Sequence, residues 1–210
     1  MNDQDDSPTM TNPVLRANFS KSVRAKSSYP LVFSTLHIEV IIEDGDWTSL
    51  GPIEALADET VGALAKYLGN ESDKKARSRC YQAALALTSD AHVAKLNETY
   101  RGKRGPTNVL SFQNPMAMPE TERHATHSPV HPAPVHLGDI VMAWQTMQEE
   151  ANERAIPPQD HFRHLLVHGL LHLAGYDHET DEQARKMEAC EVEIIKTLGV
   201  PDPYGGRATS

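Results

Sequence analysis

The most constraining feature of this chain is a histidine-rich segment, residues 164–178, which reads HLLVHGLLHLAGYDH. Its apolar character predicts a helix, on which His168 and His172 lie one turn apart on the same face. Gly175 follows, where the end of a helix favours a residue that tolerates positive φ. The chain can turn there and bring His178 back to the same point. Three neutral imidazoles around an open fourth position predict a catalytic zinc site, not a closed structural one.

The same segment resembles the long zinc-protease motif, in which H-E-x-x-H is followed by a glycine and a third histidine. The general-base glutamate of that motif would fall at position 169, where this chain has Gly169. A metal without that carboxylate can still activate water, but the usual base of a zinc peptidase is missing. We therefore expect metal chemistry other than peptide hydrolysis.

Composition narrows the class of protein. A chain of 210 residues that is 39% hydrophobic can build one domain with a real core. No stretch approaches the roughly 18 to 20 consecutive apolar residues of a membrane span, and the first ten residues lack the regions of a signal peptide. The two cysteines, Cys80 and Cys190, fit a reducing compartment. We expect a cytoplasmic protein with no membrane segment.

The charge balance limits how this chain could meet RNA. A formal net charge of -9 argues against binding through bulk charge, so contact must come from a local basic patch. The candidate patch is a glycine-containing turn with Arg101, Lys103 and Arg104, for which Glu98 is the nearest acidic partner. This turn is either a solvated loop or a phosphate clamp, because the planar fork of arginine fits phosphate. The other basic run, residues 74–79, is interpreted as a solvated face.

Periodicity predicts four strands and five helices. Strands are expected at 37–43, 81–88, 109–112 and 136–142, where β-branched or continuous apolar runs occur. Helices are expected at 53–68, about 90–100, 144–155, 162–173 and 182–198, from apolar stripes at helical spacing. Residues 1–34 and 205–210 are expected to be a disordered N-terminal extension and a disordered tail. One domain, residues 35–204, remains.

Several polar residues have two open interpretations. His164 precedes His168 by four residues and is either a partner of the metal ligands or a core histidine. Asp177 either orients a ligand or is an exposed turn residue. Asp139 lies inside an apolar strand and either caps or forms a salt bridge, or lines the site. The long loop at 113–135 carries three further histidines, which lack regular ligand spacing and are interpreted as incidental: His124, His127 and His131.

Three motifs in the same order give the chain a family resemblance. They are LNETYRGKRGPTNVLSF, LGDIVM and HGLLHLAGYDH. Together they resemble the bacterial YbeY family of metal-dependent endoribonucleases and rRNA maturation factors, over roughly residues 36–204. The resemblance implies an α/β (α+β-like) fold, with a small mixed, mostly parallel four-stranded sheet surrounded by about five helices. Asn108 and Gln113 depart from the family, since many members have Asp and Pro there.

The resemblance also implies a function. It implies one zinc ion, or another divalent metal, on His168, His172 and His178, with Arg101 as a functional residue near the metal. The implied substrate is single-stranded RNA, in 16S rRNA 3′-end maturation, small-subunit assembly and ribosome quality control. The 16S rRNA precursor and the small ribosomal subunit are then the partners, and no DNA is expected.

We hypothesise hydrolysis of an RNA phosphodiester, with Arg101 and His168 as catalytic residues. Arg101, with help from Lys103, would hold the scissile phosphate, and Arg101, Lys103 and Arg104 are the predicted substrate-binding residues. A second hypothesis is a ribosome assembly factor that docks on the small subunit and whose metal is mainly structural.

Overall fold

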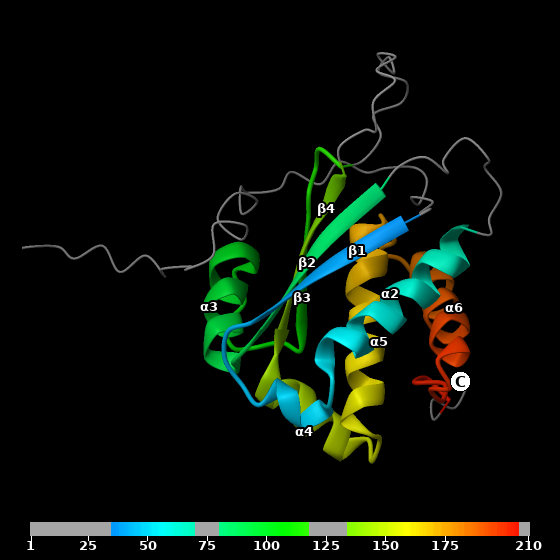
Figure 1. The fold of residues 1–210 in the computed structure, drawn as a ribbon. Helices are drawn as coiled ribbons and strands as arrows, with labels where there is room; N and C mark the ends of the chain where they lie inside the picture. The colour runs from blue at the N-terminus through cyan, green and yellow to red at the C-terminus, as the bar shows by residue number, and fades with distance from the viewer. Residues whose placement is uncertain (1–34, 70–79, 118–133, 206–210) are drawn as a thin grey trace, which may run out of the picture.

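Four strands form the central sheet of the computed structural model, which describes residues 35–69, 80–117 and 134–205. They are β1 (Thr35–Ile42), β2 (Cys80–Thr88), β3 (Val109–Gln113) and β4 (Val135–Ala143). Their order in the sheet is β1-β2-β4-β3. The pairs β1–β2 and β2–β4 are parallel, whereas β3 is antiparallel to β4. The expected small mixed, mostly parallel sheet is confirmed (Figure 1).

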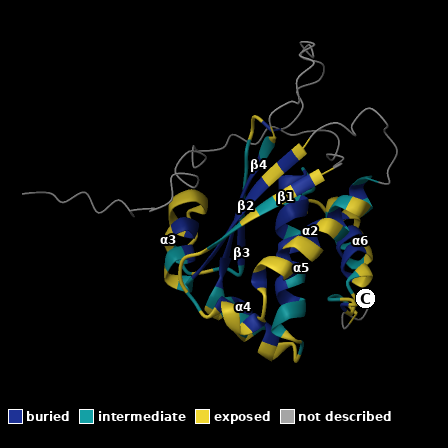
Figure 2. Cartoon of the chain, in the orientation of Figure 1, coloured by how far each residue is buried: buried dark blue, intermediate teal, exposed yellow. Residues whose placement is uncertain are grey.

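Within the described residues, five α-helices flank this sheet, as the sequence predicted. They are α2 (Ile53–Gly69), α3 (Asp90–Arg101), α4 (Trp144–Glu153), α5 (Pro158–Leu173) and α6 (Asp181–Thr197). Helix α3 lies on one side of the sheet, and α2, α5 and α6 lie on the other (Figure 1). Most of α5 is buried between its neighbours (Figure 2). Helix α5, which carries two of the three predicted metal ligands, is therefore the central element of the larger core.

The central strands are apolar on both faces because helices cover both sides of the sheet. Along β4, Ile140 and Met142 join the main core beneath α5. Val141 and Ala143 belong to a second cluster that α3 covers. Alternation along a strand sends neighbouring side chains to opposite faces, so one apolar run serves both layers.

One short element was not predicted. The 3-10 helix η1 (Trp47–Leu50) buries Trp47, whose ring centroid lies 5.0 Å from that of Trp144 and 6.3 Å from that of Phe162. Four residues are too few to show a helical period in sequence. Helix α5 also starts earlier than the predicted residue 162, because it begins at Pro158. A proline suits the first turn of a helix, where the backbone N–H that it lacks would have no partner within the helix.

Some predicted features lie outside the described residues. These are the N-terminal extension at 1–34, the basic run at 74–79, the stretch 118–133 of the long loop with its three histidines, and the tail from residue 206. Among the helices of the described part, none combines the length and apolar character that a membrane span needs.

Candidate metal centre

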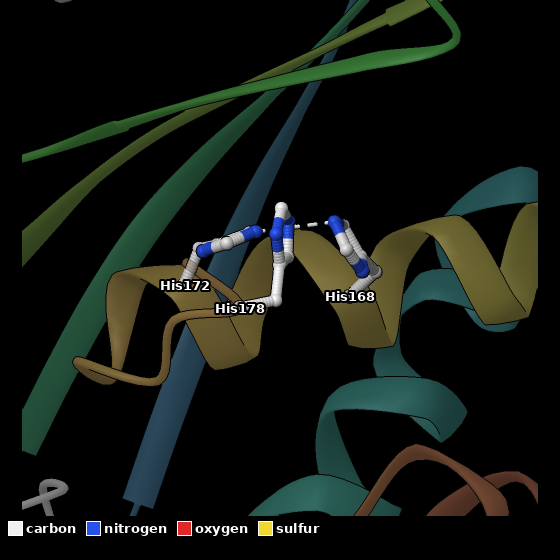
Figure 3. Close-up of side chains that lie close together, drawn as sticks. All are labelled: His168, His172 and His178. Carbon is white, nitrogen blue, oxygen red and sulfur yellow. Dashed lines mark hydrogen bonds between the residues drawn. The ribbon is translucent and has the colours of Figure 1, made fainter. Parts of the chain in front are cut away.

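Helix α5 brings two of the three predicted ligands together. His168 and His172 lie one turn apart near its C-terminal end, and their Nε2 atoms are 3.1 Å apart (Figure 3). The carbonyl of Leu171 accepts from Tyr176 and that of His172 from Gly175, so the helix stops there.

The turn after α5 supplies the third ligand. Gly175 has φ +97°, which a residue with a side chain rarely adopts. The chain reverses, and the His178 ring centroid lies 4.9 Å from that of His172 and 5.5 Å from that of His168. One nitrogen from each ring falls within 4.8 Å of the others, and His178 is exposed to solvent. The predicted juxtaposition of the three histidines is present (Figure 3).

The protonation pattern of these rings fits a metal ion. Nδ1 of His172 lies 3.2 Å from the Tyr176 carbonyl oxygen, which only accepts, so this Nδ1 carries a proton. Nδ1 of His168 likewise donates to a carboxylate oxygen of Glu191 at 2.8 Å. In neutral rings both Nε2 atoms then present lone pairs to one another. A cation between them relieves that repulsion, and tetrahedral zinc ligands lie about 3.3 Å apart.

The electrostatics favour the neutral state of the central ligand. Burial lowers the pKa of His172 to about 4, and the neighbouring His168 and His178 act in the same direction. His172 is therefore neutral near pH 7, the state in which imidazole coordinates a metal. The residues present fit a divalent ion with nitrogen ligands, such as zinc.

Behind the ligands lies a buried carboxylate that the sequence analysis missed. Glu191 of α6 is 1% exposed and accepts from His168 through Oε1. Its Oε2 accepts from His164 at 3.1 Å and from the hydroxyl of Tyr204. Burial alone would raise the pKa of Glu191, but hydrogen bonds from His164 and His168 lower it to about 2.

A sequence signal for Glu191 existed. It falls on the same stripe of α6 as Met187, Ile194 and Ile195, the face that packs into the core. An acid on the apolar face of a helix requires a buried partner. Composition alone does not separate Glu191 from the exposed acidic residues of this helix, and only its position on the apolar stripe does.

The open interpretations of the other polar residues are now narrowed. His164 is a buried partner of Glu191, one contact removed from the ligands. Asp177 accepts from the backbone N–H of its neighbour His178, which fits an orienting role in the ligand turn. Asp139 is fully buried and pairs with His136 at 3.0 Å, in agreement with the salt-bridge alternative.

Gly169 has a packing role that the sequence did not indicate. A Cβ atom there would lie 3.0 Å from Cδ1 of Ile140 and 3.2 Å from Oγ of Ser111. Position 169 therefore faces the sheet, where α5 approaches β3 and β4 closely. A glutamate at this position would start toward the sheet, so the protease-like base could not be restored by this single substitution.

We expect Gly169→Val to destabilise the fold by about 1–3 kcal/mol, because overpacking displaces its neighbours. The free energy of unfolding of the metal-free protein in urea measures this. Gly62→Val is the matched control, since Gly62 is helical but has no heavy atom within 4 Å of its built Cβ. Equal stabilities of the two variants would refute the packing role of Gly169.

The basic turn begins at the end of α3, across the edge strand from the metal helix. The ring of Tyr100, next to Arg101, packs edge-on against Phe112 of β3, with centroids 5.4 Å apart. The residues on either side of Phe112 contact α5: Ser111 donates to Gly169, and Gln113 donates to His172. Arg101 therefore follows a residue that packs against the same part of β3 that contacts the C-terminal half of α5.

The remaining cations of the turn are exposed. Arg104 lies 3.8 Å from Glu98, with both side chains largely in solvent. An ion pair of this kind contributes little stability. Lys103 is also exposed. The structure thus pairs Glu98, the acidic residue nearest to the basic turn in sequence, with Arg104.

The two departures from the family pattern both make specific contacts. Gln113 donates through Nε2 to the carbonyls of His172 and Leu173, each at 3.3 Å, and so satisfies the end of α5 beside a ligand. Asn108 donates to both carboxylate oxygens of Glu150, at 3.0 and 2.9 Å.

Glu150 connects the basic turn to two helices. It accepts from Asn108 and, at 2.7 Å, from the fully buried His161 of α5. Burial acts to raise the pKa of Glu150, but the hydrogen bonds from His161 and Asn108 outweigh it and lower the pKa below that of an ordinary glutamate. The carboxylate therefore remains ionised and holds the end of the turn in place.

Asn108→Asp should lower stability at pH 7 by about 1–3 kcal/mol, because two carboxylates would face each other and a donor would be lost. Such a pair has a raised pKa in the folded state, so the electrostatic loss is present at neutral pH, shrinks as pH falls through that raised pKa, and is gone below about 4, the pKa of the unfolded chain. Urea denaturation at pH 7 and pH 4 measures this against wild type. Asn152→Asp, an exposed change on the same helix as Glu150, should have no comparable effect.

Comparison with known proteins decides the family. The family model described as Endoribonuclease YbeY matches residues 52–199, more than half of the chain. The chain belongs to the YbeY family of endoribonucleases. The YbeY match includes the basic turn, all three histidines and Glu191, and it ends before Tyr204.

Individual YbeY relatives agree. The chain is 43% identical over 169 residues to "Endoribonuclease YbeY" of Rhodopseudomonas palustris, covering 80% of this chain and 81% of the relative. It is 44% identical over 188 residues to the protein of the same name from Parvibaculum lavamentivorans, covering 88% and 91%. A solution structure from Thermotoga maritima aligns with 22% identity and a TM-score of 0.44, covering 82% of this chain and 98% of that one.

Proposed function

We propose that this chain is a zinc-dependent endoribonuclease that hydrolyses single-stranded RNA. The observation that carries the proposal is the convergence of three imidazoles, two with their Nε2 lone pairs turned toward one point, in a chain of an endoribonuclease family. When bound, the ion supplies Lewis acidity to a phosphoryl oxygen and to the attacking oxygen. Another divalent metal could take the same place.

The chain's own residues divide the remaining work. His168, His172 and His178 hold the ion and leave one side open, and the exposure of His178 suits a large substrate. His168 is assigned as catalytic because it holds the reacting centre. Protein ligands other than these three are absent from the cluster within the described residues.

Arg101 is proposed as the catalytic cation, with Lys103 and Arg104 binding substrate phosphates. The Tyr100–Phe112 packing supports this role, because it fixes the start of the basic turn at the edge strand that also contacts α5. A guanidinium there would bind the scissile phosphate and stabilise the charge that develops on it. The net charge of -9 by itself disfavours RNA binding, so this local basic patch would supply the attraction to phosphate.

The proposed substrate is the 16S rRNA precursor, processed at its 3′ end in the cytoplasm on or near the small ribosomal subunit. Small-subunit assembly and ribosome quality control are the proposed processes. Family membership supports the RNA substrate, and the resemblance noted in the sequence suggests the rest. DNA is not a proposed substrate, and the protein is not proposed to act at a membrane.

The test is cleavage of a single-stranded RNA that carries the 16S 3′-end sequence, by protein purified free of other nucleases. We expect cleavage that stops on chelation, resumes with zinc, and is absent from duplex RNA and from single-stranded DNA. His168→Ala, purified in parallel, controls for contaminating nuclease. Equal cleavage by that variant would refute the enzyme. Cellular complementation by it would favour the assembly factor with a structural metal.

A further inference from the structure

A second layer of contacts surrounds the metal ligands and centres on Glu191. Both oxygens of this buried carboxylate are engaged: Oε1 accepts from His168, and Oε2 accepts from His164 and Tyr204. A buried carboxylate with donors on both oxygens has one preferred orientation. Glu191 therefore presents Oε1 to His168 in a fixed direction.

Glu191 and its donors come from three separate parts of the chain. His168 and His164 lie one turn apart on α5, and Glu191 lies on α6. Tyr204 belongs to the segment after α6, where its N–H donates to Asp202 at 2.8 Å in a local turn. Its ring packs edge-on against His164, with centroids 5.6 Å apart. The C-terminal segment thus returns to the metal helix.

The contacts affect how His168 coordinates. By accepting the Nδ1 proton, Glu191 selects the tautomer whose Nε2 lone pair faces the other ligands and limits rotation of the ring. His172 has only a neutral backbone carbonyl in the corresponding place. An ionised acceptor also makes the imidazole a stronger donor to a metal. The strength with which His168 would donate to a metal therefore depends on Glu191.

We propose that Glu191 is a positioning residue for the metal centre and that Tyr204 fixes the orientation of the Glu191 carboxylate. The segment after α6 would then help to set the affinity for the metal. This inference rests on the metal site of the proposed function but not on RNA cleavage. Tyr204 lies beyond residues 52–199, the part that matches the family model. The metal centre thus extends past the family motif to the end of the described chain.

The test is the zinc dissociation constant of the full-length protein, measured by competition with a chromogenic chelator. Glu191→Gln should weaken binding about 10- to 100-fold, the usual effect of losing the partner of a metal-bound histidine. Tyr204→Phe should weaken it less, by about 3- to 10-fold, as expected for one hydrogen bond. The visible spectrum of the Co²⁺-loaded protein should shift in both variants, which a purely structural role would not cause.

Two matched variants control for charge and for helix packing. Glu193→Gln removes an exposed charge two residues along the same helix. Tyr67→Phe removes a hydroxyl that donates to Cys190, the residue before Glu191 on α6. Both should bind zinc like wild type. If Glu191→Gln fails to fold, Tyr204→Phe still tests the proposal.

Wild-type zinc affinity in both Glu191→Gln and Tyr204→Phe would overturn the proposal, as would equal weakening in the control variants. The measurement involves no RNA. A protein that binds zinc in this pattern but cleaves no RNA would therefore refute the proposed function and leave the positioning role established.

Discussion

His172→Ala should remove the metal from the protein. His172 is the histidine nearest to both of the others: its ring centroid lies 4.6 Å from that of His168 and 4.9 Å from that of His178. Without it, two imidazoles remain, fewer than the three protein ligands typical of a catalytic zinc site. We expect wild type to carry about one zinc per chain, the variant to carry almost none, and RNA cleavage by the variant to fall to background.

Elemental analysis of the purified proteins checks this directly. His37→Ala is the matched control, since His37 is an exposed histidine on β1 outside the cluster, and it should keep its full metal content. Zinc occupancy of wild type should also fall in acid, because protons compete with the metal for the imidazole nitrogens. Full occupancy in His172→Ala would mean that these histidines are not the site.

The second large effect is expected at Arg101. If its guanidinium binds the scissile phosphate, Arg101→Ala removes an interaction that is strongest in the transition state. Turnover should then drop by about 100-fold or more, the scale of losing one such donor, with zinc content and folding unchanged. Arg101→Lys should recover part of the rate, because it restores the charge but not the bidentate fork.

Single-turnover cleavage of the same RNA separates chemistry from binding in these variants. Arg185→Ala is the matched control, because it removes an exposed arginine from α6 and changes the net charge equally. It should cleave at the wild-type rate. Wild-type turnover in Arg101→Ala with zinc still bound would end the catalytic assignment and leave Arg101 as a structural residue.

Local patterns predicted most of the fold. The apolar stripe of residues 53–68 and the β-branched run at 37–43 gave elements whose bounds agree with α2 and β1 within two residues. The buried Trp47 turn was missed because it is too short for a period and is stabilised by distant rings. Long-range packing of this kind leaves no trace in a short sequence window.

In the candidate site, too, neighbours in sequence could be predicted and distant partners could not. His168, His172 and His178 are close in sequence, so helix geometry and one glycine sufficed to bring them together in prediction. Glu191 and Tyr204 are separated from His168 by 23 and 36 residues, and only the packing of α6 on α5 brings them near. The reason for Gly169 likewise required knowing that Ile140 lies opposite.

This separation in sequence implies an order of assembly. The three ligands lie within eleven residues, 168 to 178 inclusive, so bringing them together closes only a short loop. Synthesis proceeds from the N-terminus, and Glu191 and Tyr204 emerge after the ligands. A nascent chain could therefore bring these imidazoles together before α6 has been made, whereas tight binding of a metal would wait until Tyr204 has been made and docked. Docking of the segment after α6 would then act as the final step of metal loading.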